Sequence, residues 1–194
     1  VIGENYVSPV RHQQACGSCY IFATMTMLES RIRIQSKNKN KITLSPQDVV
    51  SCSLYSQLCH GGFPYLASKY VQDFYVVPED CFPYKASSDF SCNKKCASPS
   101  YRVGVSNYTY VGGFYGGSSE VAMMKEIYLN GPIAVSFLVY PDFSYYSTGV
   151  YSHIKGIAGK EERVKHGGVN PWEPVTHSVA IVGWGVDDEN TGHK

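Results

Sequence analysis

The residues best suited to chemistry lie in the stretch 13–20, which reads QQACGSCY. A long amphipathic helix is predicted to begin near Ser18, so Cys19 lies at its N-terminus. The unpaired N–H groups and the macrodipole at a helix N-terminus stabilise negative charge, which favours the nucleophilic thiolate of a cysteine. Gln13, six residues earlier, carries an amide able to donate a hydrogen bond to a developing oxyanion. The stretch therefore predicts nucleophilic catalysis by Cys19.

A cysteine nucleophile needs a base, and a histidine distant in sequence but close in space commonly supplies it. The chain offers six: His12, His60, His153, His166, His177 and His193. His177 opens the apolar run 178–182, so its ring is expected to project from the end of a strand, whereas the others are placed in loops. A lone histidine is more often structural than catalytic, but the context of Cys19 favours His177 as its base.

Composition excludes several classes of partner. The chain has 194 residues, of which 43% are hydrophobic and 17% charged, with a formal net charge of +1. Such a chain buries a substantial core in one or two domains. It has no basic field to hold nucleic acid and no apolar run near the roughly 18 to 20 residues that span a bilayer. It begins without a basic and apolar leader, so we expect a fragment or a processed product.

Cysteine usage indicates an oxidising compartment. Seven cysteines are present: Cys16, Cys19, Cys52, Cys59, Cys81, Cys92 and Cys96. Three disulfides and one free thiol are the simplest arrangement of this odd number. Six cysteines allow 15 connectivities, and their spacing does not choose among them. A glycosylation sequon at Asn107 agrees with a secretory route.

Two other uses of the cysteines are disfavoured. Cys16 and Cys19 form a CxxC pair of the kind found in thioredoxin-like redox sites, but no βαβ unit precedes it. Together with Cys92 and Cys96 it would make a four-cysteine zinc site, yet the separation far exceeds that of zinc ribbons. We therefore expect no metal site.

Helices are predicted for the first half of the chain. The helix that begins near Ser18 has an apolar stripe formed by Ile21, Met25, Leu28 and Ile32, and it ends in the polar loop 37–41. The charged residues Glu29, Arg31 and Arg33 fall largely off this stripe.

Further helices follow. Ser45 is the predicted N-cap of a second helix, with Pro46 at its first position and Cys52 at its far end. A short third helix is predicted over 63–71, and a loop-rich stretch over 77–99.

Strands are predicted for the second half. Ser118 or Ser119 caps a helix that runs to Leu129 and stops at Gly131. Apolar and β-branched runs at 133–140, 149–151 and 177–184 then predict a twisted antiparallel sheet or small barrel. Between them, 154–174 is expected to be a surface loop of the kind that is often processed. The fold class is therefore α+β.

The motifs resemble those of the papain-like cysteine peptidases. The match runs, in order, through Gln13, CGSC at 16–19, LSPQ at 44–47, CHGG at 59–62, GP at 131–132 and HSV at 177–179. The resemblance implies a two-lobed fold with the active-site cleft between the lobes. Residues 1–194 would be a partial peptidase domain truncated at both ends, with a helical lobe over about 1–107 and a β-barrel-like, incomplete lobe over 108–194.

The resemblance also implies roles for single residues. Cys19 and His177 would form an ion pair that attacks the peptide carbonyl, and Gln13 would join the Cys19 N–H in the oxyanion hole. A substrate-binding segment would consist of four consecutive residues: Gly61, Gly62, Phe63 and Pro64. The implied disulfides join Cys16 to Cys59, Cys52 to Cys92 and Cys81 to Cys96, and they leave Cys19 free.

Within the family, the chain is most similar to the branch that removes dipeptides from free N-termini. The residues that carry this similarity are Tyr20, GFPY at 62–65 and YVGGFYGG at 110–117. It implies a chloride ion held by the Phe63 backbone with Tyr65 and Tyr110. It also implies peptide or protein substrates, an exclusion domain and a C-terminal segment from the same precursor, a homotetramer, and a lysosomal or secreted location.

Departures from the family pattern limit these expectations. The orienting Asn of the family, in an Asn-Ser-Trp motif after the histidine, has no counterpart in these residues, so we expect this polypeptide alone to be weakly active or inactive. Two alternatives stay open. In the first, the exclusion domain is absent and the same site is that of an endopeptidase. In the second, the chain is an inactive, disulfide-rich homologue that acts as a binding protein.

Overall fold

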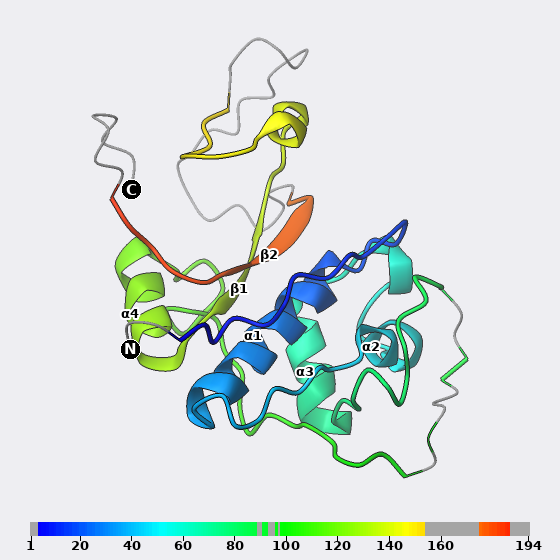
Figure 1. Ribbon diagram of the computed structural model, residues 1–194. Coiled ribbons are helices and arrows are strands. Elements are labelled where there is room, and N and C mark those ends of the chain that lie inside the picture. The colour runs from blue at the N-terminus through cyan, green and yellow to red at the C-terminus, as the bar shows by residue number, and fades with distance from the viewer. Residues whose placement is uncertain (1–3, 89–90, 93–95, 97, 154–174, 187–194) are drawn as a thin grey trace. The chain divides into compact units, whose positions relative to one another are not determined.

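A computed structural model describes residues 4–88, 91–92, 96, 98–153 and 175–186. Its elements in chain order are α1 (Cys19–Gln35), α2 (Pro46–Cys52), the 3-10 helix η1 (Leu58–His60), α3 (Pro64–Phe74), α4 (Glu120–Asn130), β1 (Ile133–Phe137), the 3-10 helix η2 (Pro141–Tyr145) and β2 (His177–Ile181) (Figure 1).

The chain forms two compact units. The first consists of Val1–Val135 and Ser178–Gly183, and the second of Ser136–His177 and Trp184–Lys194. These boundaries differ from the two lobes expected to meet near residue 107, and that division stays a prediction. In the described residues, no helix has both the length and the apolar character needed to cross a membrane.

Helix α1 is the centre of the first unit, where it packs against α2 and α3 (Figure 1). Three residues of its predicted stripe, Ile21, Met25 and Leu28, are buried together with Tyr20. They share one apolar core with side chains from the two neighbouring helices: Val49, Val50, Ala67, Tyr70 and Val71. Burial of each such aliphatic side chain contributes about 1.5 to 3 kcal/mol, so this core fixes the direction of α1.

Two charged residues of α1 are buried, although they lie off its apolar stripe. Glu29 is only 1% exposed and Arg33 8%. The Glu29 carboxylate accepts hydrogen bonds from Arg11 at 3.0 Å and from the backbone N–H of Leu44 at 2.8 Å. A buried charge is tolerated where it is paired and hydrogen-bonded. Periodicity could not reveal this pairing because Arg11 is 18 residues away in sequence.

The predicted start of α2 is confirmed. The Ser45 hydroxyl accepts a hydrogen bond from the N–H of Asp48 at 3.0 Å, and Pro46 occupies the first helical position, where it loses no helical hydrogen bond. Asp48 is buried, and it accepts hydrogen bonds from the Tyr70 hydroxyl at 2.9 Å and the Val77 N–H at 3.0 Å. These bonds join α2 to α3 and to the loop that follows it.

The two later helices also agree with their predictions. Helix α3 begins at Pro64, one residue after the expected start, and ends at Phe74. Helix α4 begins after Ser119, whose hydroxyl accepts from the N–H of Ala122 at 3.2 Å, and it is followed by Gly131 at φ 93°. Glycine adopts this left-handed conformation without a steric penalty, which explains why the helix stops there.

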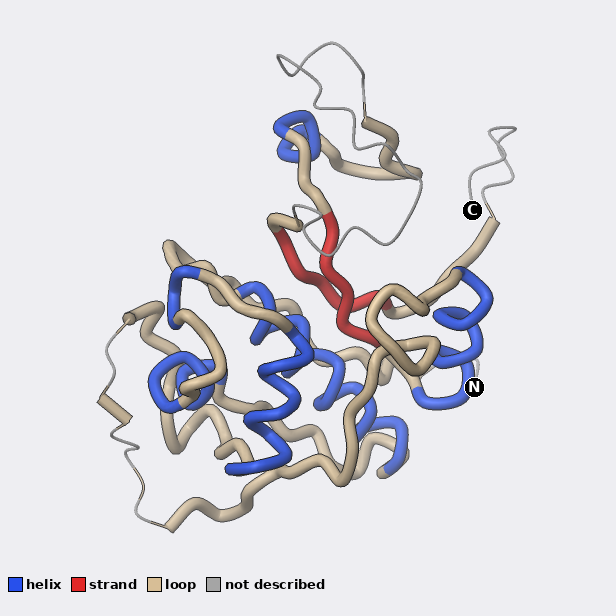
Figure 2. The backbone as a smooth tube through the Cα atoms, turned by 180° about the vertical axis from the view of Figure 1, so that it is seen from behind, coloured by secondary structure: helices blue, strands red, loops and turns tan. Residues whose placement is uncertain are grey.

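The strands are shorter than predicted. Strand β1 pairs with β2, and because the N–H of Thr176 donates to the Phe137 carbonyl, the start of β2 lies beside the end of β1 and the strands are antiparallel (Figure 2). Beyond β1 the chain turns into η2, where Pro141 cannot donate to a ladder. The prediction of a strand at 149–151 is wrong: Gly149 has φ 83°, which is incompatible with a strand.

Three disulfides staple the first unit. They join Cys16 to Cys59, Cys52 to Cys92 and Cys81 to Cys96, the same pairs that the family resemblance implied. A small second core, formed by Val77, Cys81 and Phe82, packs against Cys96, the disulfide partner of Cys81, and against Cys52 of the Cys52–Cys92 bridge. The disulfides therefore replace apolar contacts in the loop-rich part of this unit.

Candidate active site

Cys19 is the first residue of α1, and its thiol is free and partly exposed. The next backbone donors of the helix, Ile21 N–H and Phe22 N–H, both bind the Ser18 carbonyl, at 2.9 and 3.1 Å. The N–H groups of Cys19 and Tyr20 have no hydrogen-bond partner among the described residues. Free donors at a helix start stabilise negative charge on an oxygen that approaches them.

Ser18 occupies the N-cap position of α1, but its side chain makes no capping hydrogen bond. Its buried hydroxyl instead lies 2.6 Å from the hydroxyl of Tyr84. An N-cap serine usually accepts a hydrogen bond from the second or third helical N–H group. Because Ser18 is engaged elsewhere, the first turn of α1 keeps its donors.

Gln13 lies beside this helix start. One hydrogen of its Nε2 points to the carbonyl oxygen of Cys16 at 2.9 Å, and the same oxygen accepts the N–H of Ser18 at 2.8 Å. A side-chain amide has two hydrogens to donate, and the second has no partner among the described residues. Gln13 thus retains one donor for an oxyanion.

Gly17 brings two chain segments into close contact. Its N–H donates to the carbonyl of Cys59 at 2.8 Å, next to the Cys16–Cys59 disulfide. A Cβ at residue 17 would lie 2.6 Å from that carbonyl oxygen, so any side chain would force the segments apart. The glycine and the disulfide together hold residues 59–62 against the start of α1.

Gly61 and Gly62 serve two different needs. Gly61 has φ 114°, a conformation that favours glycine, and nothing lies within 4 Å of where its side chain would be; its carbonyl accepts a hydrogen bond from the Gln57 N–H at 3.0 Å. A Cβ on Gly62 would lie 2.6 Å from the ring of Tyr20. That ring is buried, and its hydroxyl donates to the Leu58 carbonyl at 3.1 Å. Burial raises the pKa of Tyr20 to about 12, so this donor stays protonated.

The residues implied for a chloride site come together in part. Phe63 precedes α3 with 59% of its surface exposed, and Pro64 is the first residue of that helix. The rings of Tyr65 and Tyr110 stack with centroids 4.3 Å apart, and the ring of Tyr108 meets Tyr65 edge-on at 4.7 Å. Two phenol groups are therefore adjacent, and phenols donate hydrogen bonds to anions.

His177 is the first residue of β2, as predicted, and it belongs to the second unit. Its ring lies edge-on to that of Phe137, with centroids 6.0 Å apart. Cys19 belongs to the first unit, so the pairing of Cys19 with His177 stays a prediction.

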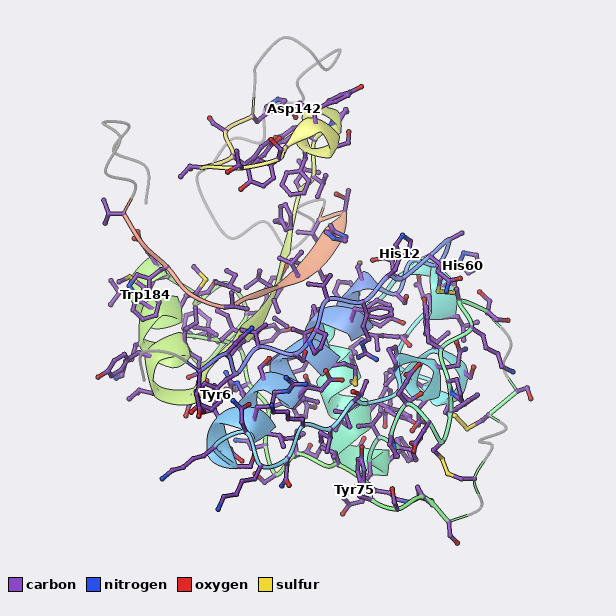
Figure 3. The ribbon with its side chains drawn as sticks, viewed as in Figure 1. Tyr6, His12, His60, Tyr75, Asp142 and Trp184 are labelled. Atoms are coloured by element: carbon purple, nitrogen blue, oxygen red, sulfur yellow. A yellow bond between two sulfur atoms is a disulfide. The ribbon has the colours of Figure 1, made fainter. Side chains whose placement is uncertain are left out.

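The other described histidines have partners or places of their own. His153 lies 3.0 Å from the carboxylate of Asp142 and stacks on Tyr140, in the second unit. His12 and His60 belong to the first unit: His12 accepts a hydrogen bond from the Gln14 N–H at 2.7 Å, and His60 is the last residue of η1 (Figure 3). His166 and His193 lie outside the described residues.

Two contacts of this region have no signal in the sequence. Tyr84 donates from its hydroxyl to the backbone carbonyl of Gln13 at 2.7 Å, although 71 residues separate them. Arg11 binds Glu29 at 3.0 Å and lies 3.5 Å from Glu79, so it holds the segment before Gln13 against α1. Both join segments that are distant in sequence and meet only in the folded chain.

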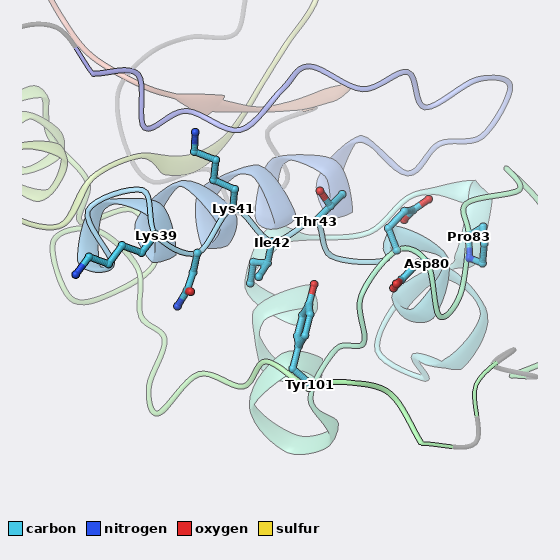
Figure 4. Close-up of a pocket in the computed structure, with 9 residues that line it drawn as sticks. Lys39, Lys41, Ile42, Thr43, Asp80, Pro83 and Tyr101 are labelled. Atoms are coloured by element: carbon cyan, nitrogen blue, oxygen red, sulfur yellow. The ribbon is translucent and has the colours of Figure 1, made fainter.

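Other candidate sites add little to this region. The sequon residue Asn107 is exposed, and its side-chain oxygen accepts the N–H of Tyr108 at 2.9 Å. An open hollow of about 710 Å³ is lined by residues of 39–43, 79–83 and Tyr101, none of them a predicted site residue (Figure 4). Among the described residues, no cluster of His, Cys, Asp or Glu could hold a metal ion.

Comparison with known proteins agrees with this geometry. A family model described as papain family cysteine protease matches residues 3–193. Cathepsin C from Schistosoma mansoni is 41% identical over 184 residues, which are 93% of this chain and 38% of that protein. Cathepsin B-like protease 1 from Arabidopsis thaliana is 34% identical, over 90% of this chain and 45% of that protein.

A third relative is dipeptidyl aminopeptidase 1 from Plasmodium falciparum, which is 30% identical over 93% of this chain and 36% of that protein. The chain thus spans about two fifths of the length of these curated relatives.

Solved structures show the same fold. The structure of procathepsin L 3 from the larval midgut of Tenebrio molitor matches with a TM-score of 0.73 and 26% identity, over 95% of this chain and 54% of that chain. The cysteine protease CMS1MS2 of Carica candamarcensis matches with a TM-score of 0.70 and 24% identity, over 93% of this chain and 73% of that chain. The chain therefore has a papain-like α+β fold.

Proposed function

The chain belongs to the papain family of cysteine proteases, and we propose that it hydrolyses peptide bonds with Cys19 as nucleophile and His177 as base. One observation carries this assignment above all: Cys19 is a free thiol on the first residue of α1, beside backbone N–H groups that have no partner among the described residues. Gln13 supplies an amide donor, and the side-chain position of Gly61 is uncovered.

In the proposed reaction, the thiolate of Cys19 attacks the carbonyl carbon of the substrate. The carbonyl π electrons move to the oxygen, which accepts hydrogen bonds from the Gln13 amide and the Cys19 N–H. Protonated His177 gives its proton to the amine nitrogen as the C–N bond breaks, which leaves a thioester. His177 then takes a proton from water as the water oxygen attacks the thioester carbonyl, and the C–S bond breaks, which releases the acid and returns the thiolate of Cys19. Each oxyanion donor contributes about 3 to 4 kcal/mol.

Thiol labelling combined with substitution tests this assignment. We expect iodoacetamide to label one thiol rapidly in the full-length protein, and Cys19→Ser to abolish both the labelling and the hydrolysis of peptide substrates. We expect His177→Ala to lower kcat by at least about a thousandfold, because the leaving amine then lacks its acid. The matched control is His60→Gln, a substitution of an exposed histidine that leaves kcat within about twofold. Full activity of Cys19→Ala would reject the assignment.

The proposal extends to the removal of dipeptides from free N-termini. It is supported by the similarity to Schistosoma mansoni cathepsin C and to a dipeptidyl aminopeptidase. The adjacent Tyr65 and Tyr110 rings support a chloride site that includes the Phe63 backbone. We further propose that an exclusion domain of the same precursor blocks the site beyond two substrate residues, and that the whole protein is a homotetramer.

Matched substrates separate this exopeptidase from an endopeptidase. We expect the full-length protein to cleave dipeptide amides with a free amine and to leave the same substrates uncut when the amine is acetylated. We expect Tyr110→Phe to weaken any dependence of the rate on chloride, whereas Tyr55→Phe, a control outside the site, does not. Equal cleavage of blocked substrates would favour the endopeptidase, and cleavage of neither would favour a binding protein.

We also propose a lysosomal or secreted location. Three disulfides in the first unit support it, because such bonds persist in oxidising compartments. The exposed side chain of Asn107 is accessible to N-glycosylation, which takes place on that route. A mass shift on glycosidase treatment that Asn107→Gln removes would support this assignment.

A further inference from the structure

We propose that Tyr84 is a positioning residue for the oxyanion hole: its hydroxyl ties the backbone of Gln13 to the first turn of α1. The inference rests on the proposed function, in which the Gln13 amide stabilises the oxyanion. Tyr84 acts through Gln13, because its own hydroxyl is fully engaged by two protein groups.

The directions of these hydrogen bonds follow from the groups involved. The Tyr84 hydroxyl lies 2.7 Å from the Gln13 carbonyl oxygen, which only accepts, so its single proton points there. The hydroxyl of Ser18 lies 2.6 Å from the same phenol oxygen and must therefore donate to it. The result is a chain of two aligned hydrogen bonds from the helix start to Gln13. Aligned hydroxyl dipoles strengthen one another.

This arrangement has a consequence for Ser18. Its proton is used by Tyr84, and its oxygen is turned from the capping position that an N-cap serine normally takes. The Tyr20 N–H, which such a cap would take, thus remains open, and so does the Cys19 N–H, which an N-cap side chain does not bind. One phenol group therefore bears on two features of the site: the placement of the amide donor and the free N–H of Tyr20.

Tyr84 is itself held from several sides. Its ring lies edge-on to Phe22 of α1 with centroids 4.9 Å apart, and its N–H donates to a carboxylate oxygen of Glu79 at 2.8 Å. Arg11 lies 3.5 Å from the other carboxylate oxygen of Glu79, and its guanidinium is 5.4 Å from the centroid of the Phe22 ring. Burial raises the pKa of Tyr84, so the hydroxyl stays protonated and keeps donating.

Gln13 needs such a tie because no helix or strand contains it. The next residue, Gln14, has φ 56°, in the left-handed region where a residue other than glycine is strained. The Gln13 amide is bound to the Cys16 carbonyl, so a shift of its backbone turns the second N–H away from the reacting oxygen. A misplacement of about 1 Å costs on the order of a hundredfold in rate.

Tyr84→Phe tests the proposal, because it keeps the ring and removes both hydrogen bonds. We expect kcat of the full-length protein to fall by roughly tenfold to a hundredfold, with KM changed by less than about threefold, since the oxyanion forms only after binding. A purely structural role would lower the Tm without this separation of kcat from KM. The matched control is Tyr55→Phe, which removes a hydroxyl bound to Asp73 and leaves kcat within about twofold.

A double-mutant cycle shows whether Tyr84 acts through the amide. Gln13→Ala removes the amide but keeps the carbonyl that Tyr84 binds. In that background we expect Tyr84→Phe to lower kcat by less than about twofold. Independent, multiplying losses would overturn the positioning role, as would full activity of Tyr84→Phe in a chain where Gln13→Ala is impaired. If Gln13→Ala has no effect, the oxyanion assignment itself fails, and this inference fails with it.

Ser18→Ala keeps the proposal testable where Tyr84→Phe folds poorly. It removes one donor, and Tyr84 keeps its hydrogen bond to Gln13. We expect a smaller loss of kcat, about threefold to tenfold, that again disappears in the Gln13→Ala background. An unchanged kcat in folded Ser18→Ala would contradict the link to the helix.

Discussion

Gly62 is fixed by its contact with Tyr20. A Cβ at this position would lie 2.6 Å from a buried ring whose hydroxyl is bonded to Leu58, so the ring has no room to retreat. We expect Gly62→Ala to lower the free energy of unfolding by about 1 to 3 kcal/mol and to reduce kcat/KM, because the segment 61–62 must shift.

Urea denaturation measures this loss. The matched control is Gly183→Ala: nothing lies within 4 Å of its side-chain position, so the free energy of unfolding should stay within about 0.5 kcal/mol. Equal stability of the two variants would show that the Tyr20 ring yields easily.

Glu29 makes the stability of the first unit depend on pH. Burial raises the pKa of Glu29 above its ordinary value near 4.5, although the Arg11 charge and the Leu44 N–H partly oppose this. The folded chain therefore holds the proton to a higher pH than the unfolded chain. Protonation of Glu29 therefore stabilises the fold. This contribution is fully present below the pKa of Glu29 in the unfolded chain and is lost as the pH rises through its pKa in the folded chain.

Glu29→Gln removes this titration. At acidic pH we expect the Tm of Glu29→Gln to be lower than that of the parent, because the substitution disturbs the packing and hydrogen bonds of Glu29. We expect this difference in Tm to narrow as the pH rises above 4.5, because only the parent loses stability there. We expect the opposite pH dependence of the Tm difference for Asp73→Asn. Hydrogen bonds from Lys69 and Tyr55 lower the pKa of Asp73, so the stability that its carboxylate contributes is lost as the pH falls. Thermal unfolding between pH 3 and 7 compares the two. A constant difference for Glu29→Gln would contradict the assignment.

Three serines precede helices and show what local sequence can and cannot predict. Ser45 and Ser119 cap their helices as expected, because the capping pattern involves only the next three residues. Ser18 does not, because its hydroxyl binds Tyr84, 66 residues away. The catalytic candidates Cys19 and Gln13 were therefore predictable from sequence, while the residue proposed to position them was not.

At the scale of elements, the disulfide Cys16–Cys59 joins the start of α1 to η1. It closes a loop between residues 43 apart, which in the chain-entropy estimate corresponds to about 4 kcal/mol. The Gln13 amide binds the carbonyl of Cys16, and the Gly17 N–H binds that of Cys59. The bridge thus supports the proposed oxyanion donor, Gln13, as well as the fold.

Removal of single bridges separates these effects. We expect the double substitution Cys16→Ala with Cys59→Ala to lower the free energy of unfolding by up to about 4 kcal/mol and kcat by at least about tenfold. The control removes Cys81–Cys96, whose partners are 15 residues apart: it costs about 3 kcal/mol and leaves kcat nearly unchanged. Parallel losses of kcat in both variants would show that the bridge acts only through global stability.

Helices were predicted more accurately than strands, for a physical reason. Helix hydrogen bonds and caps are local, so the start of α2 at Pro46 and the cap of α4 at Ser119 follow from neighbouring residues. Strand length depends on partners elsewhere in the chain, and β1 ends at Phe137 because the partner ladder ends beside it at Thr176.

At the scale of the whole molecule, one side chain shows why the division into units was not predictable. Arg31 of α1 binds Glu126 of α4 at 2.9 Å and the carbonyl of Pro132 at 2.9 Å, about a hundred residues further along the chain. These bonds help to place α4 in the first compact unit, Val1–Val135 with Ser178–Gly183, rather than with the strands after it. Charge patterns along the sequence carry no information about such distant partners.

The three disulfides overlap along the chain, because Cys52 lies inside the loop closed by Cys16 and Cys59, and Cys81 inside the loop closed by Cys52 and Cys92. With Cys81–Cys96, the loops cover every position from 16 to 96 without a gap. A single backbone cut anywhere in this stretch therefore leaves one covalent molecule, and a nicked chain separates into fragments only after reduction. An incision between residues 16 and 96 thus leaves Cys19 and its surrounding segments covalently tethered.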